Sequence, residues 1–256
     1  MKLLDPVNNA PIAIRTAVDE GWRAYRRQAW PLSGFTLVAG SVNLLAQLVF
    51  RQGSEALFNP AGDPVPLAML EAAAALLAWM LSGLWLLVGL LHGAATALEG
   101  QPVRIGLLLK PDRAAMVRSF GTIALITVVL WGVRELADAS ASLLILLQPL
   151  LAPLPLIARL AVLVYLAVDQ LLCLPITVLG GAMPLVAIQS GRRAIDPHWL
   201  QALGLLLVVS LMLLAGVLLL LAGLVVALPV ALCTLTAAYR QLFVRPGNRP
   251  TVQERG

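Results

Sequence analysis

The side chains best placed to carry chemistry are the charged residues that interrupt long apolar runs. Asp169 is the most prominent, because it lies inside the apolar run 156–188 and is followed by Gln170. A carboxyl group in such a run must be protonated, hydrated or paired, since an isolated charge in hydrocarbon is costly. Asp169 is therefore the first candidate for a functional site.

Other acidic and basic residues lie near the ends of apolar runs. Glu71 is close to the start of one run, and Arg134, Glu135 and Asp138 follow the end of another. Arg134 and Asp138 are one helical turn apart and can pair. A polar cluster of Glu71, Arg134, Asp138 and Asp169 could line a cavity. The alternatives are a structural ion pair that holds helices two to four together, or charges that are hydrated at the outer surface.

The run that contains Asp169 also carries residues that break or kink helices, namely Pro175, Gly180, Gly181 and Pro184. Broken helices beside a buried acid occur in transporters. Proline and glycine are also frequent in ordinary membrane-spanning helices. The pattern favours an interrupted fourth helix without deciding its purpose.

The sequence lacks the residue sets that catalysis or metal binding requires. It has two histidines, His92 and His198, and two cysteines, Cys173 and Cys233, with none at zinc-site spacing. We read the cysteines as buried apolar residues. A nucleophile elbow and a phosphate-binding glycine loop are both missing. We therefore predict no catalytic residue, no metal and no cofactor.

A GxxxG pattern is formed by Gly89 and Gly93. It predicts either a close contact between helices or a dimer face. The alternative is chance, because the surrounding run is apolar and has several glycines.

Composition decides the class of protein that positions these residues. Of the 256 residues, 60% are hydrophobic and 12% are charged, against about 25% charged in soluble domains. A span needs about 20 apolar residues, so the chain predicts an all-α bundle of six transmembrane helices. They fall in the runs 32–50, 66–98, from 119 to 131, 156–188, and 200–243, which holds two spans that turn between Gly216 and Gly223. Residues 133–155 are either an interfacial segment or a continuation of the third helix.

The basic residues give the bundle an orientation. With six spans, 15 of the 18 lysines and arginines fall on one side of the membrane, and Arg51, Arg134 and Arg159 fall on the other. Positive charge is retained in the cytoplasm, so both termini are expected there. We predict a cytoplasmic segment 1–30, a transmembrane domain 31–243 and a cytoplasmic tail 244–256, with no cleaved signal peptide. The basic side is expected to face anionic lipid headgroups and not nucleic acid.

Residues 11–30 predict an amphipathic helix at the inner membrane surface. Ile14, Val18, Trp22 and Tyr25 form one stripe, and the arginines lie largely off it. Trp22, Tyr25, Trp30 and, further along the chain, Trp199 are predicted as anchors at the level of the headgroups. The alternative is a leader helix packed on the bundle.

A related arrangement recurs along the chain. Gly191-Arg192-Arg193-Ala194 leads to Trp199, much as Gly21-Trp22-Arg23-Ala24 leads to Trp30, and residues 102–118 also precede a helical pair. The chain can therefore be divided into three units, each a basic segment followed by two spans. The alternative is that any loop facing the cytoplasm is basic and amphipathic.

Four stretches carry a resemblance to a known family. They are "GWRAYRRQAWPLSGF", "LHGAATALEGQPVRIGLLL", "MPLVAIQSGRRAIDPHWLQALGLLL" and "LPVALCTLTAAYRQLF". These resemble the YciC-like family of bacterial membrane proteins and the membrane domain sometimes joined to glycerophosphodiester phosphodiesterases. The resemblance covers most of the chain and implies a six-helix bundle in the inner membrane. The phosphodiesterase activity belongs to a separate soluble barrel, so no catalytic residue carries over to this chain.

Two functions follow as hypotheses. The first is a non-enzymatic accessory or scaffold bundle that interacts with lipid, with a membrane-protein partner or with further copies of itself. The second is a transporter or lipid-handling protein with a polar cavity around Asp169. An intramembrane enzyme is the least favoured, because no nucleophile and base are found together.

Overall fold

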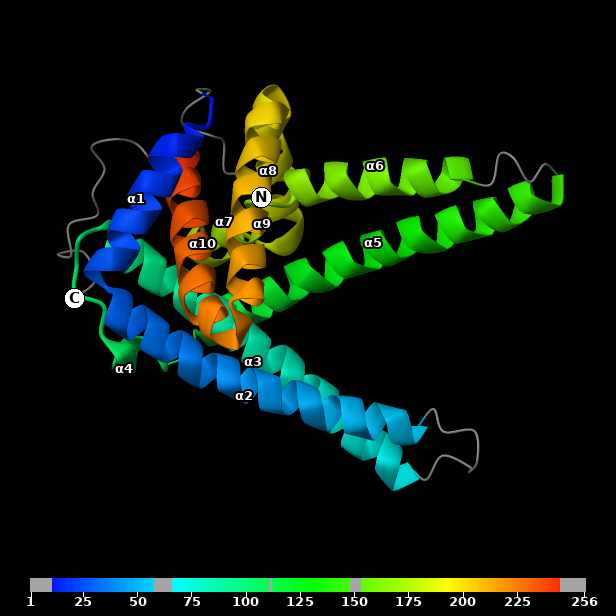
Figure 1. Cartoon of the computed structure of the whole chain (residues 1–256), viewed down its shortest axis with the longest axis horizontal. Coiled ribbons are helices and arrows are strands. Elements are labelled where there is room, and N and C mark those ends of the chain that lie inside the picture. The colour runs from blue at the N-terminus through cyan, green and yellow to red at the C-terminus, as the bar shows by residue number, and fades with distance from the viewer. Residues whose placement is uncertain (1–10, 58–65, 111, 148–152, 245–256) are drawn as a thin grey trace. The chain divides into compact units, whose positions relative to one another are not determined.

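In the computed structural model, the described residues are 11–57, 66–110, 112–147 and 153–244. Within these ranges the chain forms helices and no strand, which confirms the predicted all-α fold. In chain order the helices are α1 (Ile14–Arg27), α2 (Ala29–Leu57), α3 (Pro66–Leu98), α4 (Ile105–Leu108), α5 (Arg113–Leu147), α6 (Pro153–Asp169), α7 (Cys173–Leu179), α8 (Pro184–Ile195), the 3-10 helix η2 (Asp196–His198), α9 (Trp199–Leu218) and α10 (Leu220–Phe243) (Figure 1).

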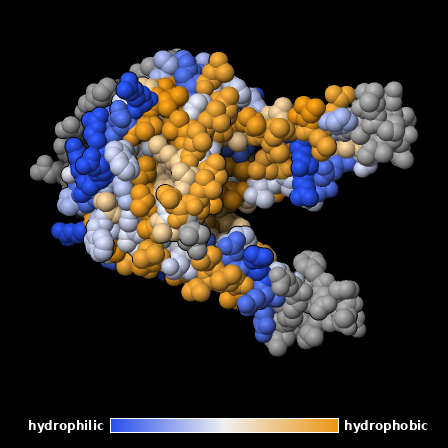
Figure 2. All heavy atoms as spheres, in the orientation of Figure 1, coloured by the Kyte–Doolittle hydropathy of each residue, from blue (hydrophilic) through white to orange (hydrophobic). Residues whose placement is uncertain are grey.

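Six stretches in the described part are long and apolar enough to cross a membrane. They are Ala29–Ser54, Met69–Leu98, Arg113–Leu144, Pro153–Leu179, Pro184–Leu218 and Ala222–Phe243. Many of their leucines and valines are exposed, as is expected of side chains that face lipid. Figure 2 shows apolar side chains over α9 and hydrophilic side chains over α1. These six stretches have the length and composition of membrane spans and suggest a multi-pass membrane protein.

The boundaries of the spans answer several questions left open by the sequence. The third span continues as helix α5 to Leu147, so residues 133–147 extend it, and residues 148–152 lie outside the described part. The fourth apolar run is divided into α6 and α7, and α8 begins a separate helix at Pro184. The last run turns at Leu219, between Gly216 and Gly223 as predicted.

The chain divides into two compact units, which we describe separately. The first unit holds residues 1–17, 117–208 and 238–256, and the second holds residues 18–116 and 209–237. The first unit thus contains most of α5, all of α6, α7 and α8, and the start of α9. The second contains α2, α3, α4 and most of α10.

In the second unit, α2 and α3 lie side by side as a helical hairpin (Figure 1). Aromatic pairs join the two helices at both ends of the contact. Phe35 meets Trp85 edge to face at 5.5 Å, and Phe50 stacks on Trp79 at 5.6 Å. Between them the Asn43 amide donates to the Trp79 carbonyl at 3.0 Å. A polar amide inside an apolar helix is therefore satisfied within the hairpin, as a lipid environment requires.

The GxxxG pattern of α3 forms contacts within this chain. A Cβ atom on Gly89 would lie 2.5 Å from the Phe35 ring, and one on Gly93 would lie 2.8 Å from Leu32 and 3.0 Å from Leu108. The two glycines therefore let α2 and α4 approach α3 closely. Because the chain itself covers both glycines, the close-contact interpretation holds and they do not form a dimer face.

Helix α1 packs on the bundle through small residues. A Cβ atom on Gly21 would lie 2.7 Å from the backbone of Thr234 in α10. Ala24 and Tyr25 on the same side of α1 are also buried. The residue before the helix, Ala13, donates its N–H to the Gln241 side chain of α10 at 3.1 Å. One face of α1 is thus packed on the bundle, as the leader-helix alternative predicted. The opposite face of α1 exposes arginines.

The element order follows the three-unit division of the sequence only in part. The first two pairs of spans are each preceded by a short helix, α1 or α4, whereas α8 forms the first part of the fifth candidate span. Each short helix also meets an earlier or later span at a glycine: α1 at Gly21, α4 at Gly89 and Gly93, and α8 at Gly191. These contacts differ in which helix carries the glycine and in how close they are, and the internal repeat stays a prediction.

Candidate functional site

Asp169 is the last residue of α6, at the point where the fourth span is broken. The Cys173 amide donates to the Gln170 carbonyl at 3.1 Å and so departs from the regular helical pattern. Pro175 explains the break, because a proline ring clashes with the carbonyl four residues earlier, here that of Leu171. In the first turn of the new helix α7, the same proline is tolerated.

The Asp169 side chain is 9% exposed and pairs with Arg192 of α8 at 3.8 Å, a long contact. Arg192 also lies 3.5 Å from Asp196, so two carboxylates share one guanidinium group. The other carboxylate oxygen of Asp169, Oδ1, is buried and has no hydrogen-bond partner in the described part. The site therefore holds a buried acid whose charge is only partly compensated.

Helix α8 packs against this break at Gly191. A Cβ atom on Gly191 would lie 3.5 Å from the Asp169 carbonyl oxygen and 3.4 Å from the sulfur of Cys173. One turn before Asp169, the Tyr165 ring stacks on Trp199 with centroids 6.3 Å apart. The predicted anchor Trp199 is thus half-buried against α6, and its indole does not simply face headgroups.

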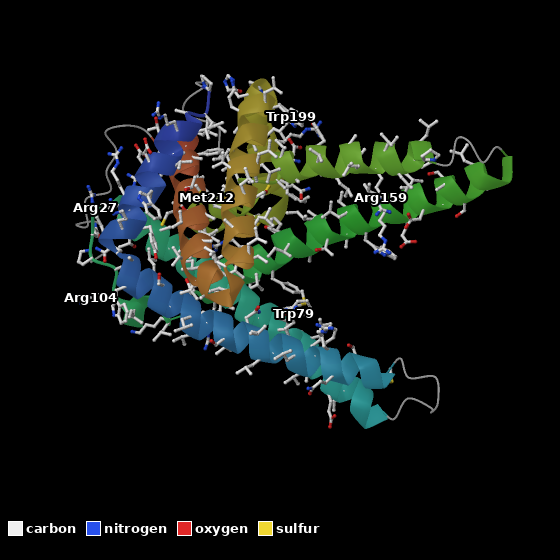
Figure 3. All side chains as sticks on the ribbon, viewed as in Figure 1. Arg27, Trp79, Arg104, Arg159, Trp199 and Met212 are labelled. Atoms are coloured by element: carbon white, nitrogen blue, oxygen red, sulfur yellow. The ribbon has the colours of Figure 1, made fainter. Side chains whose placement is uncertain are left out.

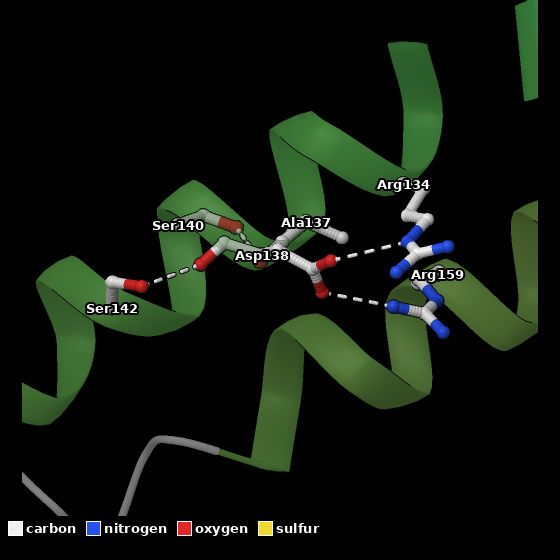
Figure 4. A network of polar contacts seen from close by, with 6 residues as sticks. All are labelled: Arg134, Ala137, Asp138, Ser140, Ser142 and Arg159. Carbon is white, nitrogen blue, oxygen red and sulfur yellow. Dashed lines mark hydrogen bonds and ion pairs between the residues drawn. The ribbon is translucent and has the colours of Figure 1, made fainter. Parts of the chain in front are cut away.

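A second polar group joins α5 to α6 (Figure 4). Asp138 accepts a hydrogen bond from Arg159 at 2.8 Å and lies 3.6 Å from Arg134 on its own helix. The Arg134–Asp138 pair was predicted, whereas Arg159 was not included in the predicted cluster. Its position offered a signal: Asp138 lies nine residues before the end of α5, and Arg159 lies six residues after the start of α6. Helices joined by a short connection bring such positions opposite one another.

Within the first unit, the structure does not bring Asp169 together with Arg134 and Asp138. Asp169 follows Arg159 by ten residues in α6, which is about 15 Å along the axis, and it pairs with Arg192 instead. Glu71 is exposed on α3, in the other unit. The prediction is therefore right for Arg134 with Asp138 and wrong in joining Asp169 to them, because that part of α6 meets α8.

The Asp138 group lies where a membrane boundary is expected. Twenty residues of α5 separate Arg118 from Asp138, which is about 30 Å, the thickness of the hydrocarbon core. The side chains of Asp138 and Arg134 are 46% and 67% exposed. This geometry favours the alternative in which these charges are hydrated at the surface.

The predicted anchors of the N-terminal segment have different environments. Trp22 is 45% exposed and Trp30 is 83% exposed, as residues facing headgroups would be. Tyr25 is only 7% exposed, and its hydroxyl shares a hydrogen bond of 2.9 Å with Ser33. Its role as an anchor is corrected: Tyr25 lies on the face that packs against the bundle.

Potential metal ligands are dispersed in the described residues, where no group of three histidine, cysteine or acidic side chains could hold an ion. Cys173 and Cys233 are both buried and unpaired. Both cysteines are thus buried, as the sequence suggested.

Comparison with known proteins found no match among protein-family models, curated proteins or solved structures.

Proposed function

We propose that this chain is an accessory or scaffold bundle of a bacterial inner membrane that has no catalytic activity and engages anionic lipid through its cytoplasmic face. One observation carries the proposal: α1 turns its arginines outward beside two exposed tryptophans. Arg15, Arg23, Arg26 and Arg27 are all exposed. Basic residues on the outer face of a surface helix attract anionic headgroups.

The orientation follows from the distribution of charge. Fifteen of the 18 basic residues precede or follow the spans on the side assigned to α1, and the positive-inside rule supports a cytoplasmic location for both termini. The YciC-like resemblance agrees with this location. The anionic inner leaflet would then lie next to α1, where its charge has most effect.

The proposal predicts that anionic lipid protects α1. We expect hydrogen exchange of residues 14–27 to slow in nanodiscs containing phosphatidylglycerol, relative to phosphatidylcholine alone. High salt should reverse the protection, because exposed charges are screened over about 10 Å at 0.1 M. The internal control is α3, whose exchange should not respond. Equal exchange of α1 in both lipids would reject lipid engagement and favour a protein partner on this face.

The second candidate is a transport or lipid-handling function at Asp169. It is favoured by the buried oxygen Oδ1, which has no partner in the described part, at the end of a broken helix. Buried acids beside broken helices serve ion coupling in transporters. The competing view is that Asp169 only ties α6 to α8 through Arg192.

A double-mutant cycle separates these two views. If the pair is structural, Arg192→Gln lowers the thermal stability, because it leaves the Asp169 charge buried and unpaired, and adding Asp169→Asn restores part of the loss. If Asp169 carries protons, Asp169→Asn instead abolishes proton flux into proteoliposomes that contain a pH-sensitive dye. Arg113→Gln removes the same charge from an exposed arginine of α5 and is the matched control for Arg192→Gln.

A further inference from the structure

A small group of arginines on α1 forms a concave surface. Arg23, Arg26 and Arg27 line an open cavity of about 310 Å³. Their spacing of three and four residues places them on one side of the helix, in the turn that ends at Arg27. We refer to these three residues and the space between them as the arginine cavity.

The charge of the arginine cavity is not compensated by the described chain. No ion pair joins any of the three arginines to an acidic side chain within the described ranges. Like charges at this spacing repel one another. An anion bound between them would relieve the repulsion, and guanidinium groups bind phosphate oxygens through paired hydrogen bonds.

A fourth arginine lies close to this site. The Val103 amide donates to the Gln28 side chain at 3.3 Å, which fixes the loop before α4 beside the end of α1. Arg104 is the next residue, and Figure 3 shows Arg27 and Arg104 on the same side of the molecule. The positive field at the arginine cavity therefore comes from two segments that are tied together.

Neighbouring aromatic residues indicate that the anion belongs to a lipid. Trp22 lies one turn before Arg26 and is 45% exposed, and Trp30, at the start of α2, is 83% exposed. Tryptophan prefers the headgroup region, where one side of the ring is apolar and the other is wet. A free phosphate would gain nothing from these rings.

We infer that the arginine cavity is a specific site for a lipid headgroup that carries two negative charges, either as two phosphates or as one terminal phosphate. The three positive charges of the guanidinium groups exceed the single negative charge of a phosphodiester. A headgroup with two negative charges therefore neutralises more of the positive charge. Basic pockets beside membrane helices are known to bind such headgroups. This inference rests on the proposed engagement of anionic lipid and adds the class of lipid and its site.

The test uses the full chain in phosphatidylcholine nanodiscs and counts bound lipid by native mass spectrometry. Cardiolipin, phosphatidic acid and phosphatidylglycerol are compared at equal total headgroup charge. We expect the two doubly charged lipids to bind about tenfold more tightly than phosphatidylglycerol, the effect of one added charge-assisted contact. Inorganic phosphate at the same concentration should displace neither.

Three variants assign the preference to the arginine cavity. Replacing Arg23, Arg26 and Arg27 with Gln should remove the tenfold preference. The matched control replaces Arg15, Lys110 and Arg113 with Gln, changes the net charge equally and should keep the preference; all three residues are exposed. Replacing the cavity arginines with Lys retains the charge but not the fork-shaped geometry, and should reduce the preference by at least half. The helical content of each variant, measured by circular dichroism, verifies folding.

The outcomes separate the inference from the proposed function. Equal affinity for all three lipids at equal charge would overturn the specific site while leaving general lipid engagement intact. Loss of the preference in the control variant would overturn the assignment to the arginine cavity. Displacement by inorganic phosphate would overturn the lipid as the source of the anion. If none of the lipids binds above the neutral background, both the inference and the proposed function fail.

Discussion

Replacing Gly21 with Ala is expected to destabilise the protein by about 3 kcal/mol, at the upper end of overpacking effects. The added Cβ atom would lie 2.7 Å from Cα, N and Oγ1 of Thr234 in α10. Backbone atoms cannot move aside as a flexible side chain can, so α1 must shift as a whole. We expect the melting temperature of the full chain in detergent to fall by roughly 6–12 °C.

Gly40→Ala is the matched control for this change. Gly40 lies inside α2, and a Cβ atom there would meet nothing within 4 Å. The same substitution should therefore raise the stability by about 0.4–1 kcal/mol, through the lower entropy of the unfolded chain. If Gly21→Ala behaved like Gly40→Ala, α1 would lie free on the membrane surface and would not be packed on α10.

The six spans and their order were predictable because hydrophobicity is a local property of the sequence. Runs of apolar residues give the length of each span, and Gly216 and Gly223 correctly bracketed the last turn. The course of residues 133–147 was open, because a helix with Arg134, Glu135 and Asp138 fits an interface as well as a longer span. Pairing Asp138 with Arg159 of α6 offsets some of that charge, which helps the helix to continue.

The environment of Asp169 was only partly predictable. Pro175 indicated a broken helix, and the structure confirms a break between α6 and α7. The partner could not be predicted, since it depends on a reversal of the chain after α7. Gly181 adopts φ +65° there, a conformation that favours glycine, and α8 then brings Arg192 back to Asp169. The partner of Asp169 is determined by the packing of helices that are distant in sequence.

The face of α1 shows a similar limit. A helical stripe of large apolar residues predicted Trp22 and Tyr25 on one side. Instead, Gly21 and Ala24 are buried with Tyr25, and Trp22 is exposed. Gly21 and Ala24 lie on the buried face because small side chains let α1 approach α10 closely. Hydrophobicity alone does not reveal this requirement. This rotation turns the arginines outward together and so creates the arginine cavity.

The last turn of the bundle should be as sensitive as the contact of α1. Gly223→Ala would place a Cβ atom into the carbonyl oxygen of Gly216 and 2.7 Å from the Leu219 side chain. The opposite change, Gly216→Ala, would meet Ala227 at 2.5 Å. A single non-helical residue, Leu219, separates α9 from α10. A connection this short does not allow the two helices to move apart.

We therefore expect Gly223→Ala to cost about 3 kcal/mol as well, again from overpacking against backbone. The measurement is the melting temperature in detergent, with Gly132→Ala as control, because a Cβ atom on Gly132 of α5 would meet nothing within 4 Å. The double variant Gly21→Ala/Gly223→Ala should show nearly the sum of the single losses, since the sites share no contact. An unchanged melting temperature for Gly223→Ala would mean that α9 and α10 are not held this closely, and that the small residues at the turn serve only to reverse the chain.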